Sequence, residues 1–286
     1  MGFTNSMGEL SARDFQTIRQ IVYDSIGVNL TEAKKALVVS RLSKRLRELK
    51  MQTFAQYFRF LHSSPTETEV MFNYLTTNVT RFFREEHHFE YLCHEYLPYC
   101  ELQAKEGFGK KDIKAWSAGC STGEEPYTLA MVLQDYFRGK GGWTVNILAS
   151  DVNTAVLEKA ATGVYTKQEI EGIPYNYLKR YFKMGAGSNA GYFKTKKVLR
   201  DIVDFRRLNL VSPAKYPAAG SLNMIFCRNV FIYFDRETRR EILERFQRCL
   251  LPGGLLFLGH SESINTLDGR NGCWRVLRHT IYEKIS

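Results

Sequence analysis

The stretch WSAGCSTGEEPYTLA, residues 116–130, decides the fold, because an apolar strand runs into a short glycine loop that opens directly into a helix. Gly119 and Gly123 flank this loop, which lets a ligand approach backbone N–H groups at the start of the helix. The spacing differs from GxGxxG, and Glu124 and Glu125 would repel a pyrophosphate. The loop therefore favours a cationic or hydroxyl-rich ligand over a dinucleotide.

Strands and helices alternate on both sides of this loop. The pattern predicts strands over 114–118, 146–150, 224–227 and 254–258 and helices over 125–136, 154–162 and 235–249. Such alternation is typical of an α/β fold with a doubly wound parallel sheet. Asp151 ends the second strand, where a carboxylate can accept hydrogen bonds from both ribose hydroxyls of a nucleoside. Alternatively, Asp151 caps the helix that begins at Thr154.

The first part of the chain has a different pattern. Apolar residues recur at three- and four-residue spacing, which predicts short helices over 11–26, 31–50, 54–62 and 67–75. Residues 1–84 hold 12 basic and 7 acidic side chains, so half of the net charge of +10 lies in this part. We therefore expect an all-α domain over 1–84 and an α/β domain over 85–286.

A further segment interrupts the α/β pattern. Residues 175–205 are rich in Lys, Tyr and Phe around MGAGSNAG (184–191), whose glycines suit a hairpin turn. We expect a small antiparallel insertion there.

Composition limits the class of protein. The 286 residues are 44% hydrophobic and 24% charged, as in an ordinary globular protein, and the pI near 9.2 favours an anionic partner. The sequence has neither an apolar run long enough to span a membrane nor a secretion signal, so we expect a cytoplasmic protein. Its six cysteines include no CxxC pair, which predicts reduced thiols. The irregular spacing of His87, His88, Cys93 and His94 argues against a metal site.

Five segments together resemble the CheR family of chemotaxis receptor methyltransferases: TTNVTRFFRE (76–85), STGEEPY (121–127), ASDVNTAVLEKA (149–160), FCRNVFIYFD (226–235) and GHSES (259–263). The resemblance implies an N-terminal helical receptor-docking domain and a class I, Rossmann-like S-adenosylmethionine-dependent methyltransferase domain with a small β-subdomain insertion. It also implies a protein-glutamate O-methyltransferase that esterifies glutamates on the cytoplasmic helices of chemoreceptors and releases S-adenosylhomocysteine, without a metal.

The resemblance assigns residues to the site. Those expected to bind the cofactor are Asn78, Thr80, Arg84, Glu125, Asp151, Asn209, Leu210, Arg228 and Asn229. Arg84 and Tyr233 are the expected catalytic residues, with Tyr233 facing the transferable methyl group. A glutamate carboxylate is already ionised at neutral pH, so the reaction needs alignment of the nucleophile and no general base. Arg84 either orients that carboxylate or pairs with Glu85, and Tyr233 either shapes the methyl pocket or packs with its aromatic neighbours.

A basic arc lies on the second predicted helix. Lys34, Arg41, Lys44 and Arg47 lie opposite the apolar arc of that helix, where an anionic receptor helix could dock. The alternative is an ordinary solvated surface. Some CheR-family members use the β-subdomain to hold a short C-terminal receptor tail, and the glycine hairpin at 184–191 has a similar length, so the resemblance implies a tail-peptide site on the insertion.

Two other classes of protein remain as alternatives. A nucleic-acid methyltransferase is disfavoured because the chain has no Asn/Asp-Pro-Pro-Tyr/Phe segment after the fourth strand and no Pro-Cys nucleophile. A non-catalytic module that binds the cofactor is disfavoured because every family motif is present. We therefore expect neither nucleic acid nor direct membrane insertion.

Overall fold

The computed structural model describes residues 10–264 and 272–285, which fall into two compact units. Residues up to Thr77, together with Tyr233–Asp235, form the helical unit. Asn78–Ile232 and the residues from Arg236 onward form the α/β unit. The chain therefore crosses between the units at three peptide bonds.

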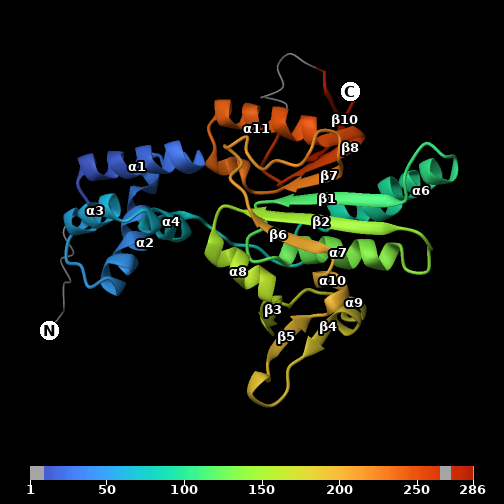
Figure 1. Ribbon diagram of the computed structural model, residues 1–286, viewed down its shortest axis with the longest axis horizontal. Helices are drawn as coiled ribbons and strands as arrows, with labels where there is room; N and C mark the ends of the chain where they lie inside the picture. The colour runs from blue at the N-terminus through green and yellow to red at the C-terminus, as the bar shows by residue number, and fades with distance from the viewer. Residues whose placement is uncertain (1–9, 265–271, 286) are drawn as a thin grey trace. The chain divides into compact units, whose positions relative to one another are not determined.

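The helical unit is all-α, as the sequence predicts (Figure 1). It consists of α1 (Ala12–Ile26), η1 (Glu32–Lys34), α2 (Lys35–Glu48), α3 (Phe54–Ser63) and α4 (Pro65–Leu75). The predicted second helix, 31–50, is thus a short 3₁₀ turn followed by α2. The Ser11 side chain accepts a hydrogen bond from the Asp14 N–H and caps α1, and Gly27 ends this helix with a φ of 69°.

A buried ion pair stabilises this unit. Glu67 of α4 is 3% exposed, and its carboxylate accepts bonds from Arg45 Nε at 2.9 Å and Arg45 Nη2 at 2.7 Å. The Tyr57 hydroxyl also donates to Glu67 at 3.1 Å. Burial of a carboxylate is tolerated when its oxygens are paired in this way, so the network fixes how α2, α3 and α4 pack.

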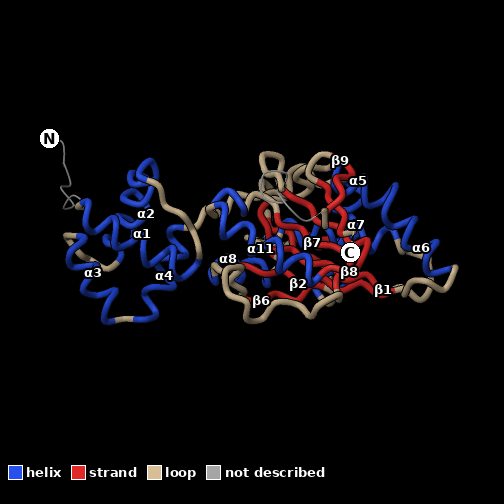
Figure 2. The backbone as a smooth tube through the Cα atoms, turned by 90° about the horizontal axis from the view of Figure 1, so that it is seen from above, coloured by secondary structure: helices blue, strands red, loops and turns tan. Residues whose placement is uncertain are grey.

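The α/β unit contains a seven-stranded sheet in the order β6-β2-β1-β7-β8-β10-β9 (Figure 2). The strands are β1 (Asp112–Ala118), β2 (Thr144–Asp151), β6 (Val203–Arg207), β7 (Leu222–Cys227), β8 (Leu250–Leu258), β9 (Trp274–Arg278) and β10 (Ile281–Lys284). The first five pair in parallel, whereas β10 is antiparallel to both β8 and β9. The sheet is therefore mixed, and not wholly parallel as the sequence alone suggests.

Helices cover the two faces of this sheet. Helices α7 (Glu124–Tyr136) and α8 (Thr154–Thr162) lie on one face and α11 (Arg236–Cys249) lies on the other (Figure 1). Within the α/β unit, β1 is preceded by α5 (His87–Tyr91), the π-helical η2 (Leu92–Tyr96) and α6 (Leu97–Lys105). Residues 208–221, all described, contain neither a helix nor a strand between β6 and β7. Part of the α11 side of the sheet thus lacks the helix that a doubly wound fold would place there.

The expected antiparallel insertion is present as a separate three-stranded sheet in the order β3-β5-β4. Its strands are β3 (Val164–Thr166), β4 (Phe182–Met184) and β5 (Tyr192–Thr195), accompanied by α9 (Tyr175–Tyr181), η3 (Gly187–Asn189) and α10 (Lys197–Arg200). The end of the expected range, 175–205, reaches into β6, which pairs with β2 of the large sheet instead. The insertion also takes its first strand from residues before that range.

Gly123 directly precedes α7 and adopts a left-handed φ of 97°. A Cβ atom there would lie 2.8 Å from Tyr165 Oη and 2.9 Å from Ala160 Cβ. Glycine at this position therefore lets the loop after β1 reach α7 without backbone strain or a steric clash.

We predict that Gly123→Ala lowers the free energy of unfolding by about 1–3 kcal/mol, because it adds backbone strain and a steric clash. Gly139→Ala is the matched control, because Gly139 also has a positive φ, 79°, but its Cβ would meet nothing within 4 Å. Thermal unfolding of both variants checks this. Equal losses would show that the clash with Tyr165 and Ala160 contributes nothing.

Candidate cofactor and active site

The expected cofactor residues follow neighbouring strands of the large sheet. Because β1, β2 and β7 are parallel, their carboxyl ends meet at one edge. Glu125 follows β1 by one loop, Asp151 ends β2, and Arg228 and Asn229 follow β7 directly. The fold therefore brings these four residues to one edge of the sheet.

The glycine loop after β1 is held tightly at this edge. The N–H groups of Gly119 and Cys120 both donate to the Ser150 carbonyl, at 2.8 and 2.9 Å. Gly119 has a φ of 84°, and a Cβ there would lie only 2.4 Å from Val230 Cγ2. The loop is thus fixed against the ends of both β2 and β7.

Asp151 connects this loop to the start of α8. Its Oδ2 accepts the Ser121 N–H and its Oδ1 accepts the Asn153 N–H, both at 2.9 Å. The helix cap is Asn153, whose side chain accepts the Val156 N–H at 3.1 Å, so the alternative role of Asp151 as that cap is wrong. Burial raises the pKa of Asp151, and the backbone N–H groups partly oppose this shift. Each carboxylate oxygen has a further lone pair that can accept a hydroxyl group.

Asn229 lies where β7 meets the loop after β8. It has a left-handed φ of 60°, and its N–H donates to Glu262 Oε2 at 2.8 Å. Glu262 is 6% exposed and also accepts the N–H groups of Gly259 at 2.7 Å and Ile232 at 3.3 Å. Its pKa is raised by burial. One buried carboxylate therefore holds both loops.

Glu125 is held at the first turn of α7. Its Oε1 accepts the Ser117 hydroxyl and its Oε2 accepts Arg228 Nε, both at 2.6 Å. The Arg228 side chain is only 2% exposed, so its guanidinium faces the protein interior.

The segment that contains Asn78, Thr80 and Arg84 joins the same edge. The Asn78 carbonyl accepts the Ser121 hydroxyl at 2.9 Å, and the Phe83 N–H donates to Thr128 Oγ1 at 3.2 Å. Arg84 Nη1 donates to the Val79 carbonyl at 3.1 Å. Within the described residues Arg84 forms no ion pair with Glu85, whose Oε2 lies 3.7 Å from Arg228 Nη1 instead.

The segment after β6 is attached to the end of β2, because the Leu208 N–H donates to the Asp151 carbonyl at 3.1 Å. Asn209 Oδ1 accepts the Val211 N–H at 3.2 Å. The Leu210 carbonyl accepts the Tyr216 hydroxyl at 2.7 Å and Arg245 Nη1 at 2.9 Å. Asn209 and Leu210 therefore follow directly on a residue bonded to Asp151.

Tyr233 belongs to the helical unit. Its hydroxyl donates to the Thr77 carbonyl at 3.3 Å, its own carbonyl accepts the Asn29 N–H at 2.8 Å, and Lys34 Nζ lies 5.6 Å from its ring centre. Its role at the methyl group stays a prediction.

The four residues expected to dock the receptor differ in how available their charged groups are to a partner. Arg41 is committed to the unit, because its guanidinium donates to the Leu75 carbonyl at 2.5 Å and to Thr77 Oγ1 at 2.8 Å. Lys34 is half-buried, and burial lowers its pKa. Lys44 and Arg47 are exposed, while Val38, Leu42 and Leu46 on the opposite arc are buried.

The residues present fit S-adenosylmethionine. Asn229 Oδ1 is a buried oxygen that has no hydrogen-bond partner among the described residues, which suits a cationic amine. Asp151 offers acceptors for ribose hydroxyls, and the carboxylates of Glu85 and Glu125 outnumber the one guanidinium beside them. This excess negative charge suits a cofactor that carries both an ammonium and a sulfonium group.

The described residues contain no group of three His, Cys, Asp or Glu side chains that could hold a metal ion, and none of their helices could cross a membrane. All six cysteines are free thiols. His88, from the cluster considered above, is buried and contacts Thr280 Oγ1 at 2.9 Å.

Sequence reasoning gave no role to Glu262, Ser121 or His88. GHSES marked the region of Glu262, but nothing in that motif indicates that its carboxylate binds main chain.

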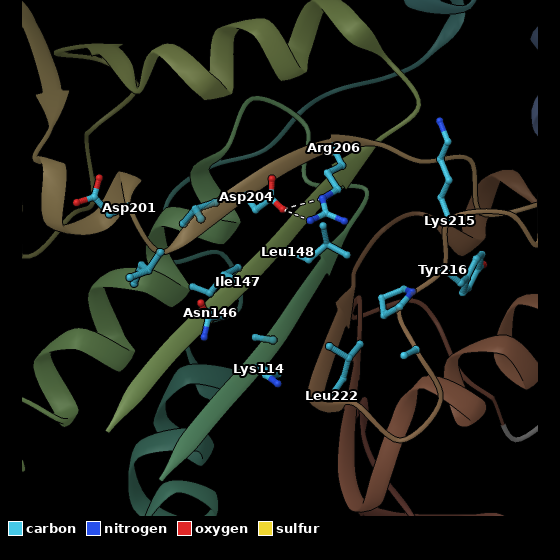
Figure 3. A pocket seen from close by; sticks show the side chains of 15 residues that line it. Lys114, Asn146, Ile147, Leu148, Asp201, Asp204, Arg206, Lys215, Tyr216 and Leu222 are labelled. Carbon is cyan, nitrogen blue, oxygen red and sulfur yellow. Dashed lines mark hydrogen bonds and ion pairs between the residues drawn. The ribbon is translucent and has the colours of Figure 1, made fainter. Parts of the chain in front are cut away.

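A pocket of about 480 Å³ lies elsewhere on the sheet. It is lined by Lys114, Asn146 and Leu148 of β1 and β2, by Asp204 and Arg206 of β6, and by the segment around Tyr216 (Figure 3). None of the expected cofactor residues lines it. It opens where no helix connects β6 with β7.

The sheet order, the glycine loop after β1 and the acidic end of β2 define a class I methyltransferase that uses S-adenosylmethionine. Comparison with known proteins identifies the family. Residues 78–277 match the CheR methyltransferase SAM-binding domain and residues 13–76 match the CheR all-alpha domain, so the chain belongs to the CheR methyltransferase family.

Relatives of similar length support this assignment. Chemotaxis protein methyltransferase 2 of Pseudomonas aeruginosa is 43% identical, over 91% of this chain and 90% of its own length. The chemotaxis protein methyltransferases of Escherichia coli and Salmonella typhimurium are 42% and 40% identical, and the alignments cover 91% and 90% of this chain and 88% and 86% of theirs. The chain is therefore a methyltransferase of the chemotaxis type.

We predict that Asp151→Ala weakens S-adenosylmethionine binding by roughly ten- to a hundredfold, because a charged acceptor of hydrogen bonds is lost. Asp204→Ala on β6 is the matched control, since Asp204 pairs with Arg206 and lies in the other pocket. Isothermal titration calorimetry measures both affinities.

The same titrations should depend on pH. Because the pKa of Asp151 is raised, the carboxylate takes up a proton sooner on acidification than an ordinary aspartate does, and affinity falls with it. Asp151→Ala should lack that part of the pH dependence. Unchanged affinity in a folded Asp151→Ala variant would remove Asp151 from the site.

Proposed function

We propose that this protein transfers the methyl group of S-adenosylmethionine to glutamate side chains of chemoreceptors in the cytoplasm, giving glutamate methyl esters. Its membership of the CheR family and the names of its relatives support the link to chemotaxis. The choice of a carboxylate as acceptor depends on Arg84.

Arg84 is the observation that carries the proposal. It is half-buried at the edge where the cofactor residues meet, and one hydrogen bond from Nη1 to the Val79 carbonyl orients it. A guanidinium has five N–H donors in a planar fork that matches a carboxylate, so further donors remain for an acceptor glutamate. A cationic group at this position suits an anionic nucleophile.

The chemistry required of the protein is limited. When bound, S-adenosylmethionine supplies an activated methyl group that is displaced in line. The acceptor carboxylate is ionised at neutral pH, so the chain has to orient it and keep water away. We assign the orientation to Arg84, and we retain Tyr233 as the residue that shapes the methyl site. Tyr233 follows Ile232, whose N–H is held by Glu262.

The insertion is our proposed binding site for the receptor tail peptide. β4 is an edge strand of its sheet, with backbone groups that an extended peptide can pair with. Lys183 of β4 lies directly across from Lys194 of β5, and an anionic peptide would relieve the repulsion between these two exposed lysines.

A methyl-transfer assay tests the proposed function. Purified protein, labelled S-adenosylmethionine and a receptor cytoplasmic fragment should yield base-labile esters, and the rate should be nearly flat between about pH 6.5 and 8.5 because no base must titrate. Arg84→Lys should lower turnover at every pH, since lysine lacks the planar fork. Receptor fragments without their acceptor glutamates or without their tail are the controls. Label in added RNA, or binding of the cofactor without any transfer, would contradict the proposal.

Docking through the basic arc gives a separate prediction. Lys44→Glu with Arg47→Glu should reduce receptor methylation several-fold at low salt, because rim charges mainly accelerate encounter, and the deficit should shrink as salt is added. Affinity for S-adenosylmethionine should stay unchanged. Lys50→Glu with Arg59→Glu is the control in the same unit, with the same change in charge. Equal losses of receptor methylation in the two double variants would mean that only the net charge of the protein matters.

A further inference from the structure

The side chain of Arg228 lies in a buried cluster beneath the cofactor edge. The residue follows β7, its side chain is 2% exposed, and its guanidinium carbon lies 5.4 and 5.6 Å from the ring centres of Phe89 and Phe226. A buried guanidinium beside two aromatic rings needs polar partners for its N–H groups. Those partners show what Arg228 does.

One side of the guanidinium holds Glu125. Nε donates to Glu125 Oε2 at 2.6 Å, while the Ser117 hydroxyl holds the other oxygen, Oε1, at 2.6 Å. Both oxygens of the carboxylate are thus fixed from the protein side. Glu125 has a single orientation toward a ligand as long as Arg228 is in place.

The other side of the guanidinium holds the main chain of Arg84, one of the two expected catalytic residues. Nη1 donates to the Arg84 carbonyl and lies 3.7 Å from Glu85 Oε2. It also lies 3.4 Å from His88 Nδ1. Since an arginine N–H can only donate, His88 Nδ1 must accept, and the proton of this histidine is on Nε2, toward Thr280.

The segment that Arg228 holds is strained. Phe83 and Glu85 both adopt left-handed φ values, 52° and 56°, which are unfavourable for residues other than glycine. Arg84 lies between them, and its carbonyl is the group that Arg228 binds. Glu85 Oε1 in turn accepts the His260 N–H at 3.0 Å. Removal of the Arg228 bond would let this turn relax and carry the Arg84 side chain with it.

We propose that Arg228 is a positioning residue that couples Glu125 to the main chain of Arg84, and that its guanidinium does not itself touch the cofactor. Loss of the planar guanidinium of Arg228 misplaces two groups at once. One is the carboxylate of Glu125 at the start of α7, on the cofactor side, and the other is Arg84, on the acceptor side. The Arg84 part rests on the proposed function; the Glu125 part requires only cofactor binding.

A double-mutant cycle on cofactor affinity tests the Glu125 part without any acceptor. Calorimetry with S-adenosylmethionine should show that Arg228→Lys and Glu125→Gln each weaken binding by about tenfold. The double variant should bind no more than about threefold more weakly than whichever single variant has the lower affinity. If Arg228 contacts the cofactor independently, the two losses multiply, and the proposal is overturned. Arg180→Lys is the matched control, because Arg180 pairs with Asp135 in the same unit.

Turnover at saturating cofactor tests the Arg84 part. Arg228→Lys should lower kcat, and its combination with Arg84→Lys should cost little more than the larger single loss. Unaltered kcat in Arg228→Lys would contradict this part. If the parent protein methylates no receptor, the proposed function fails, whereas the calorimetric cycle still decides whether Arg228 positions Glu125.

If Arg228→Lys does not fold, neutral variants test the same coupling between Arg228 and Glu125. Arg228→Gln combined with Glu125→Gln replaces the ion pair by two neutral amides and leaves no unpaired buried charge between them. This double variant should bind S-adenosylmethionine more tightly than Arg228→Gln alone, because restored pairing is what positions the residue at 125. Weaker binding by the double variant would overturn the coupling.

Discussion

The carboxyl edge of the large sheet depends on buried carboxylates that accept hydrogen bonds from main-chain and side-chain donors. Asp151 holds the loop after β1, Glu262 holds the loops after β7 and β8, and Glu125 is fixed by Ser117 and Arg228. A buried carboxylate without such donors would cost several kcal/mol, on the order of the whole stability of a domain. Each loop is therefore restricted to the conformation that satisfies its carboxylate.

This arrangement explains three non-glycine residues with left-handed backbone at the same edge. Ser121, Asn229 and Glu85 have φ values of 49°, 60° and 56°, and each is bonded to a carboxylate or carries one. Strain of about 1–3 kcal/mol for each residue persists only where surrounding bonds enforce it. The enforced loops present backbone groups and carboxylates to a ligand without further ordering, which lowers the entropic cost of binding.

Most of the fold could be predicted from the sequence, because strand and helix periods are strong where one face is apolar. The small antiparallel sheet followed from the glycines at 184–191, but the antiparallel β10 and β9 were not recognised, because β9 is mostly exposed and has no apolar period. The position of Asp151 at the end of β2 was predictable. Its bond to Ser121 was not, since the bond depends on a loop thirty residues away in the chain. Likewise, the residues Arg228 and Asn229 indicate that a strand ends in polar side chains, but they do not indicate that the guanidinium of Arg228 faces the protein interior.

The same burial that shapes the site sets opposing trends of stability with pH. Asp151 and Glu262 have raised pKa values, so the folded state binds their protons more readily than the unfolded state does, and these two groups stabilise the fold as pH falls through the raised values. His88 acts in the opposite sense. Burial, followed by the charge of Arg228, lowers its pKa to about 2, so only the unfolded chain takes up this proton below about pH 6.5, at a cost of about 1.4 kcal/mol per pH unit. His88 lies against Arg228, so acidification weakens the cluster around Arg228, whereas protonation of Asp151 and Glu262 acts in the opposite sense at the same edge.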